Sequence, residues 1–220
     1  MKAALSAARI STYEVAADII DPATGAPDPT STQALELYAW NALVSSALLM
    51  PLHVCEVVVR NAVSEALETK YGANWPWSSS FERSLTDPPV GYNPRRDLRS
   101  ARKRVSTTGK VIPELKFVFW QKLFTARHDK RLWDGYLPAV LPNIGAGAAL
   151  TVAQARERVY NDLEQIRKLR NRIAHHEPII ARNLQGDFQR IEELIQFRCH
   201  DTAGWMRNNQ QAVTLIAARP

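Results

Sequence analysis

The chain has 220 residues, enough to bury a full hydrophobic core, and we expect one domain spanning residues 1–220 with no second catalytic domain. Its composition, 45% hydrophobic and 23% charged, is that of an ordinary globular protein. With Lys+Arg 28 against Asp+Glu 22, the net charge is +6. This charge mildly favours polyanionic partners, although many soluble proteins carry it without binding nucleic acid.

The cysteines and the apolar stretches indicate the cellular compartment in which we expect the protein. Cys55 and Cys199 are the only cysteines, and their apolar helical contexts fit buried thiols in a reducing cytoplasm rather than a disulfide framework. The N-terminal stretch carries Arg9 and Glu14 where a signal peptide needs an unbroken apolar run, and residues 42–52 are too short to span a bilayer. We therefore expect a cytoplasmic protein without a membrane partner.

The first half of the chain is patterned as helices. Apolar residues recur at spacings of three and four, which predicts an all-α fold, and residues 3–20 form the first expected helix. Residues 21–32, with three prolines, are expected to be a loop in which Ser31 or Thr32 caps the next helix. A long helical tract follows and ends at Gly72. Its expected apolar face is Leu37, Trp40, Val44, Leu48, Val54, Val58 and Ala62, with Pro51 either kinking the tract or starting a second helix.

A basic segment lies near the middle of the chain. Residues 73–80, "ANWPWSSS", are expected to be a loop anchored by its aromatic residues, and residues 93–110 carry seven basic side chains. The stretch 95–104 is expected to be a basic helix, either a solvated face or a surface that contacts RNA phosphates. The candidate RNA-binding residues are Arg95, Arg96, Arg99, Arg102, Lys103 and Arg104.

The second half continues the helical pattern. Pro113 is expected to open a helix through residue 133 with Leu115, Phe119, Leu123 and Trp133 in the core. After a loop at 141–149, the longest late helix is expected at 151–176, and two shorter helices at about 186–199 and 209–218.

The stretch "KLRNRIAHHEP", residues 168–178, concentrates chemically capable side chains at the end of that late helix. Val159, Leu163, Ile166, Leu169 and Ile173 form an apolar stripe, and Arg170, Asn171 and His175 lie together beside it because each residue advances about 100°. His176 falls on the opposite shoulder of the stripe, where a structural role is the favoured interpretation. Pro178 indicates that the helix ends near His176.

Two interpretations of this helix end remain. Basic side chains are favoured near a helix C-terminus by the macrodipole, so the cluster can be a solvated helix end. Alternatively, histidine can move a proton near neutral pH and arginine presents a fork of donors to a phosphate, which together suffice for phosphodiester cleavage. RNA supplies its own nucleophile, the 2′-hydroxyl. Adjacent histidines diverge on a helix and the chain has no metal-ligand spacing, so we expect no metal and no cofactor.

The motif "RNRIAH" at 170–175 resembles the R-N-x-x-x-H form found in HEPN-domain proteins, and "LRNRIAHHEPI" is similar to the signature of bacterial Abi-like (abortive-infection) proteins. Residues 5–17, 37–75 and 109–133 also look like blocks of that family in its order. The resemblance implies a HEPN-like helical bundle with additional N- and C-terminal helices. It also implies a homodimer in which the motif helices of two protomers face each other.

The resemblance further implies a function. It makes Arg170 the phosphate-binding arginine, Asn171 its polar neighbour and His175 the catalytic histidine of a metal-independent endoribonuclease. Abi-like relatives are associated with phage defence, commonly as toxins that cut RNA, so an antitoxin or a regulatory RNA is a further possible partner. The alternatives are a non-catalytic RNA- or nucleotide-binding module on the same bundle, and a structural interaction protein.

A second pair, Arg60 and Asn61, lies in one of the family-like blocks. Glu56 precedes Arg60 by four residues, so the simplest interpretation is an ion pair within one helix. The alternative is that these residues support the arginine or histidine of the motif from a neighbouring helix. If Glu56 reached His175, it would raise the pKa of that imidazole.

Overall fold

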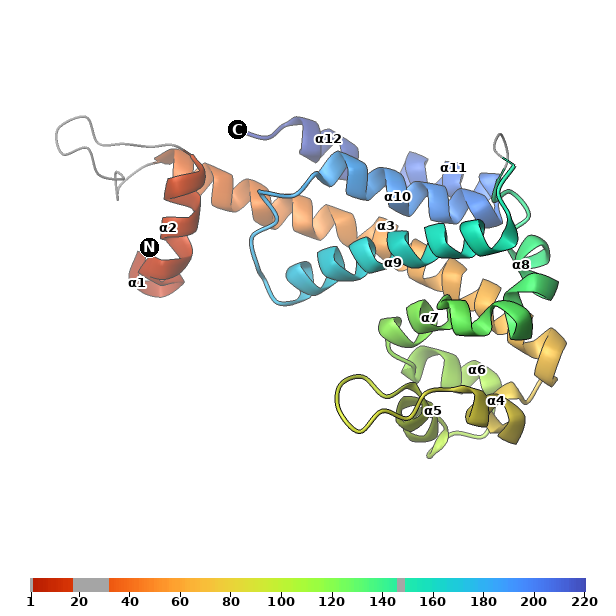
Figure 1. The fold of residues 1–220 in the computed structure, drawn as a ribbon. Coiled ribbons are helices and arrows are strands. Elements are labelled where there is room, and N and C mark those ends of the chain that lie inside the picture. The colour runs from red at the N-terminus through yellow and green to blue at the C-terminus, as the bar shows by residue number, and fades with distance from the viewer. Residues whose placement is uncertain (1, 18–31, 146–148) are drawn as a thin grey trace.

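The computed structural model describes residues 2–17, 32–145 and 149–220, and every element formed there is helical, which confirms the all-α class (Figure 1). The α-helices are α1 Lys2–Leu5, α2 Ala7–Ala16, α3 Thr32–Tyr71, α4 Ser79–Ser84, α5 Pro94–Arg102, α6 Thr108–Val111, α7 Phe117–Leu123, α8 Asp134–Val140, α9 Val152–Ala174, α10 Leu184–Arg198, α11 His200–Asn209 and α12 Ala212–Ala217. Short 3-10 or π turns cover Trp75–Trp77, Ile112–Glu114, Ala126–His128 and Asp129–Trp133.

The long helix α3 is the centre of the molecule and contacts α2, α7, α8, α9, α10 and α12. It runs through Pro51 as one element, so the alternative of a second helix beginning there is wrong. The tract ends as predicted at Gly72, whose φ of 86° places it in the left-handed region and whose N–H donates to the carbonyl of Glu68 at 2.8 Å. Beyond Pro51 the buried face is Cys55 and Val59 rather than Val54 and Val58, which are half-buried.

Helix α3 also meets the length and composition criteria for a membrane span, with a mean hydropathy of 1.9 over its most apolar window. Some 39% of that window is buried inside the protein. Length and composition alone do not separate a membrane helix from the central helix of a soluble bundle. The contacts that α3 makes with six other helices are those of a core helix.

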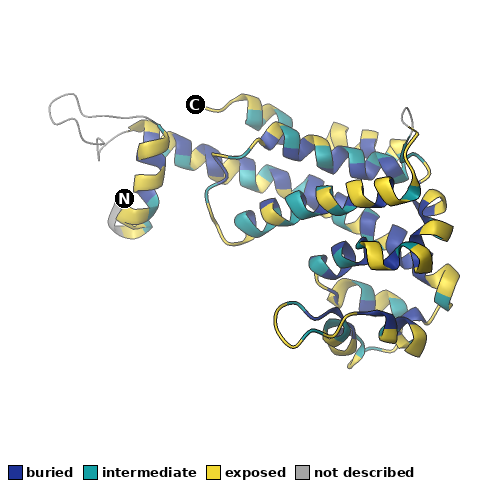
Figure 2. Ribbon diagram, viewed as in Figure 1, coloured by how far each residue is buried: buried dark blue, intermediate teal, exposed yellow. Residues whose placement is uncertain are grey.

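Helices α9 and α10 lie along α3 (Figure 1). Thr151 begins α9 with a capping box, in which its hydroxyl accepts the N–H of Gln154 and the Gln154 side chain accepts the N–H of Thr151. The predicted stripe of Val159, Leu163, Ile166, Leu169 and Ile173 is buried throughout, which confirms the period-based prediction. Figure 2 shows this pattern, with buried positions on the inner faces of the long helices and exposed positions outside.

The helix expected at 113–133 is wrong in its continuity, because only Phe117–Leu123 is α-helical. Two side chains take the carbonyls that the next helical turn would need. The indole of Trp133 donates to the carbonyl of Leu123 at 2.6 Å, and Arg156 donates to the carbonyl of Phe124 at 3.4 Å. The predicted core positions Leu115, Phe119, Leu123 and Trp133 are nevertheless all buried.

The chain ends also differ from expectation. Ser6, with a φ of 66°, separates α1 from α2, so the helix predicted at 3–20 is interrupted, and its last residues lie outside the described part of the chain. The predicted loop before Thr32 lies outside the described residues too, with its candidate cap Ser31. Helix α11 was not predicted, and Cys199, expected to be buried, is only half-buried between α10 and α11.

Candidate active site at the end of α9

The last turn of α9 closes in a two-bond C-terminal cap. His176 adopts a φ of 55°, its N–H donates to the carbonyl of Ile173 at 3.0 Å, and the N–H of Glu177 donates to the carbonyl of Arg172 at 2.8 Å. This is a Schellman motif with histidine in the position that usually holds glycine. The predicted helix end near His176 is confirmed, and the left-handed residue rather than Pro178 alone produces it.

Three further contacts fix this turn. Arg172 lies 3.7 Å from the carboxylate of Glu177, an ion pair where a Schellman motif commonly has a hydrophobic contact, and its Nε donates to the carbonyl of Pro178 at 3.0 Å. The guanidinium of Arg9, from α2, donates to the carbonyl of His176. The end of α9 is therefore held in one geometry from both sides.

Arg170 is held from α3. Its Nε lies 3.7 Å from Oε2 of Glu56, while Oε1 of Glu56 accepts a hydrogen bond from Arg60. Glu56 therefore makes both the predicted i,i+4 pair and a contact with the motif arginine, and its described partners do not include His175. The Arg170 side chain remains 43% exposed, so the contact with Glu56 does not bury it.

The other motif residues are accessible. His175 is exposed at the C-cap, and its imidazole makes no hydrogen bond or ion pair with another residue of the described ranges. Asn171 is half-buried one turn earlier, and its carbonyl accepts the N–H of His175 at 2.9 Å. Asn61, on α3, is exposed.

His176 is not the packed histidine that its helix position favoured. Its side chain is exposed rather than packed, and its main chain makes the turn. Beside it lies a cavity of about 310 Å³, where α2, α3 and the end of α9 meet. Tyr13 lines this cavity, and its buried hydroxyl has no hydrogen-bond partner.

An apolar strip lies on α3 next to the motif. Leu43, Leu49 and Val57 are exposed at 57%, 52% and 39%, at spacings that place them on one side of the helix. Glu56 and Leu49 both neighbour residues of the last turns of α9, because Glu56 contacts Arg170 and Leu49 shares the cavity with Ile173. The motif is therefore bordered by apolar side chains that the described residues leave exposed.

The basic segment presents a different arrangement. The predicted helix at 95–104 is present as α5, Pro94–Arg102. Glu82 of α4 accepts hydrogen bonds from Arg99, at 2.7 Å, and from Arg102. Arg95 donates to the carboxylate of Asp87 at 3.1 Å and to the carbonyl of Leu85 at 2.8 Å. These three arginines fasten α5 to α4 and the loop that follows it.

The remaining basic residues of this segment are exposed to solvent. Arg96, Lys103 and Arg104 are exposed and make no ion pair within the described part of the chain. Glu82, which sequence reasoning did not single out, decides which cations remain available. Burial raises the pKa of Glu82, but the hydrogen bonds from Arg99 and Arg102 outweigh it and the net shift is downward.

No protein-family model, curated protein or solved structure matches the chain. In the described residues no three His, Cys, Asp or Glu side chains gather where they could hold a metal ion.

Proposed function

We propose that this chain is a metal-independent endoribonuclease of the HEPN type, with Arg170 and His175 as its reactive pair. The observation that carries the proposal is a pair of accessible groups at the end of α9. Arg170 contacts Glu56 and its side chain is 43% exposed, while His175 is exposed and its imidazole makes no hydrogen bond or ion pair within the described residues. Both side chains are accessible to a phosphate group, and His175 would break no contact within the described residues to reach it.

The reaction follows from those groups. The 2′-hydroxyl of RNA attacks the adjacent phosphorus, the O2′–P bond forms and the P–O5′ bond breaks. A histidine takes the proton from the 2′-hydroxyl or gives one to the leaving 5′-oxygen. Arg170 stabilises the charge that grows on the phosphate. Glu56 acts as a positioning residue, because its carboxylate holds Arg170 and Arg60 in place.

A second copy of the chain completes the proposed site. A symmetric dimer presents the same patch from both protomers, so the motif helices meet at the two-fold axis. Two copies of His175 then supply one general base and one general acid. The exposed Leu43, Leu49 and Val57 beside the motif are the apolar side chains that such an interface would cover.

The biological setting rests on the resemblance to Abi-like proteins. On that basis the enzyme acts in the cytoplasm as an abortive-infection toxin, restrained by an antitoxin or regulatory RNA until phage infection. Arg96, Lys103 and Arg104 would contact RNA phosphates outside the cleavage site.

The second candidate function is RNA or nucleotide binding without catalysis. The exposed Arg96, Lys103 and Arg104 and the cavity beside His176 favour it, because both would serve binding and neither requires proton transfer. Binding of this kind would survive the loss of the His175 imidazole.

Incubation of the purified chain with RNA in EDTA tests the proposal, with the ends of the products mapped. We expect 2′,3′-cyclic phosphate and 5′-hydroxyl ends, and light scattering should show a dimer. Cleavage that disappears in EDTA and returns with magnesium would contradict the mechanism. Tight RNA binding without cleavage under any of these conditions would favour the second candidate.

A further inference from the structure

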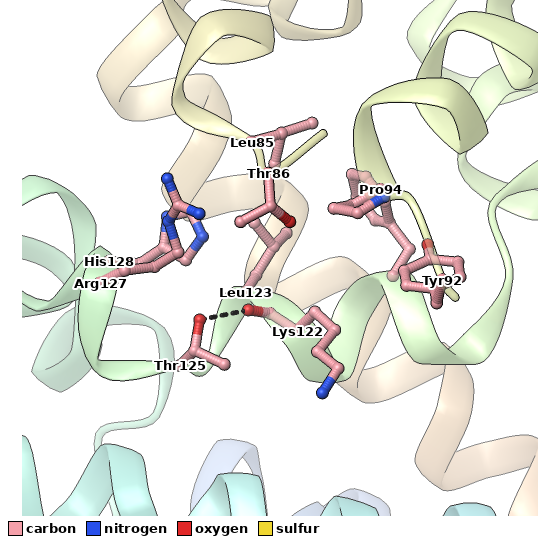
Figure 3. Close-up of a pocket in the computed structure, with 10 residues that line it drawn as sticks. Leu85, Thr86, Tyr92, Pro94, Lys122, Leu123, Thr125, Arg127 and His128 are labelled. Carbon is pink, nitrogen blue, oxygen red and sulfur yellow. Dashed lines mark hydrogen bonds between the residues drawn. The ribbon is translucent and has the colours of Figure 1, made fainter. Parts of the chain in front are cut away.

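A second cavity, of about 280 Å³, lies away from the motif, between the loop after α4, the start of α5, α7 and the turn Ala126–His128 (Figure 3). Its apolar wall comes from Leu85, Pro94, Phe119 and Leu123. Lys122, which lines the cavity, contacts Tyr160 of α9, and Tyr160 precedes Arg170 by ten residues, about 15 Å along the helix. The proposed ribonuclease chemistry does not use this cavity.

One buried polar group lines the cavity without a partner. His128 is 4% exposed, and its imidazole makes no hydrogen bond to any residue of the described ranges. Burial, followed by the charges of Arg127 and Arg131, lowers the pKa of His128 to about 4, so the ring is neutral near pH 7. A neutral imidazole offers one donor and one acceptor. The ring borders the cavity, so its donor and acceptor can reach a ligand there.

A free cation lies next to that imidazole. Figure 3 shows Arg127 and His128 side by side on one wall of the cavity, with Pro94 and Tyr92 on the opposite wall. Arg127 is exposed and makes no ion pair in the part of the chain that the structure describes. The ammonium of Lys122 is directed elsewhere, since it lies 3.3 Å from the hydroxyl of Tyr160. Arg127 is therefore the cation available to a ligand.

We propose that this cavity binds a small organic anion, with its apolar body between Leu85, Phe119 and Leu123, its acid group on Arg127 and a hydrogen bond from His128. A cavity of this size holds about ten to fifteen non-hydrogen atoms. Inorganic phosphate would leave the apolar wall unfilled, and a neutral hydrocarbon would leave both polar side chains unpaired. An aromatic or branched carboxylate, or a phosphate monoester with an apolar body, satisfies both walls.

Fluorine NMR on the full-length protein tests this proposal with 4-fluorobenzoate as the probe and 4-fluorobenzyl alcohol as its neutral counterpart. We expect the benzoate to bind about ten-fold more tightly than the alcohol, because a charge-assisted hydrogen bond to arginine is available only to the acid. Comparison of benzoate with phenyl phosphate separates carboxylate from phosphate recognition. Equal binding of benzoate and alcohol would overturn the proposal.

Variants locate the probe. Arg127→Ala is expected to weaken benzoate binding about ten-fold and to leave the alcohol unchanged. Thr86→Phe, at an exposed position on the cavity rim, should exclude both probes, and the melting temperature of each variant checks its folding. Arg104→Ala is the matched control, since it removes an equal charge from an exposed site outside this cavity. Benzoate binding that Arg127→Ala and Thr86→Phe both leave intact would overturn the assignment, as would its displacement by a short RNA.

Discussion

Helix α5 and the end of α9 are both basic, and their arginines are in opposite situations. In α5, Arg95, Arg99 and Arg102 donate to Glu82, Asp87 and main-chain carbonyls, so their charges hold one helix against its neighbours. At the end of α9, Arg170 has one carboxylate contact among the described residues, with Glu56 at 3.7 Å, and its side chain is 43% exposed. A run of positive charge in a sequence therefore does not reveal which cations can meet a ligand. The position of the nearest carboxylate decides it.

The largest effect is expected at Arg170. Arg170→Ala should lower the rate of RNA cleavage by about 10²–10³-fold, because it removes a donor aimed at the charge of the transition state. Single-turnover kinetics measure this loss, and Arg102→Ala is the comparison because that arginine is occupied within the protein. Glu56→Gln should give a smaller loss with a similar KM, since the amide keeps the shape but not the charge. Equal damage from Arg102→Ala and Arg170→Ala would remove the distinction between the two regions.

The next effect concerns the stability of α5. Glu82→Gln should lower the free energy of unfolding by about 1–2 kcal/mol at pH 7, because Arg99 and Arg102 lose their charged acceptor. The folded-state pKa of Glu82 is lowered, so its contribution is present above the unfolded pKa of about 4.3 and is lost as pH falls through the folded value. Urea unfolding at pH 7, 5 and 3.5 should show wild type and variant converging at the acidic end. A constant difference at all three pH values would argue against this role.

Salt dependence separates the open cations of the basic segment from the occupied ones. The double variant Arg96→Ala and Arg104→Ala should reduce the slope of log K against log salt by about 1.4 for single-stranded RNA, if each side chain contacts one phosphate. Arg95→Ala should leave the slope unchanged and lower the melting temperature, because this arginine fastens α5 to the preceding loop. An unchanged slope in the double variant would show that Arg96 and Arg104 face solvent without contacting RNA.

The smallest effect is expected at the C-terminal cap of α9. His176→Gly should raise the free energy of unfolding by about 0.5–1 kcal/mol, because glycine adopts a φ of 55° without the steric cost that a side chain carries. His176→Ala keeps that cost and is the control. Chemical denaturation of the three proteins measures the difference. A glycine variant less stable than the alanine variant would contradict a main-chain role for His176.

Local patterns predicted much of the fold. The period of 3.6 residues gave the buried stripe of α9, and Gly72 marked the end of α3. The prediction of a continuous helix to residue 133 was wrong because Trp133 and Arg156 capture carbonyls of Leu123 and Phe124 through tertiary contacts. Periodicity contains no information about such contacts.

In the candidate site, too, contacts within one helix were predicted and contacts between helices were not. Helical spacing placed Arg170, Asn171 and His175 together, and the i,i+4 pair of Glu56 with Arg60 is local too. The contact of Glu56 with Arg170 joins two helices. From the sequence, this contact was only an alternative to an ion pair within one helix. The role of Glu82 was not predicted, because α4 meets the basic helix only once the chain has folded.

The most direct test of the proposed active site compares two adjacent histidines. RNA cleavage in EDTA is measured for wild type, His175→Ala and His176→Ala, with circular dichroism and RNA binding measured in parallel. We predict that His175→Ala loses about 10²–10⁴-fold in rate while fold and binding persist, and that His176→Ala retains nearly full activity. Full activity in His175→Ala, or an equal loss in both variants, would contradict the assignment.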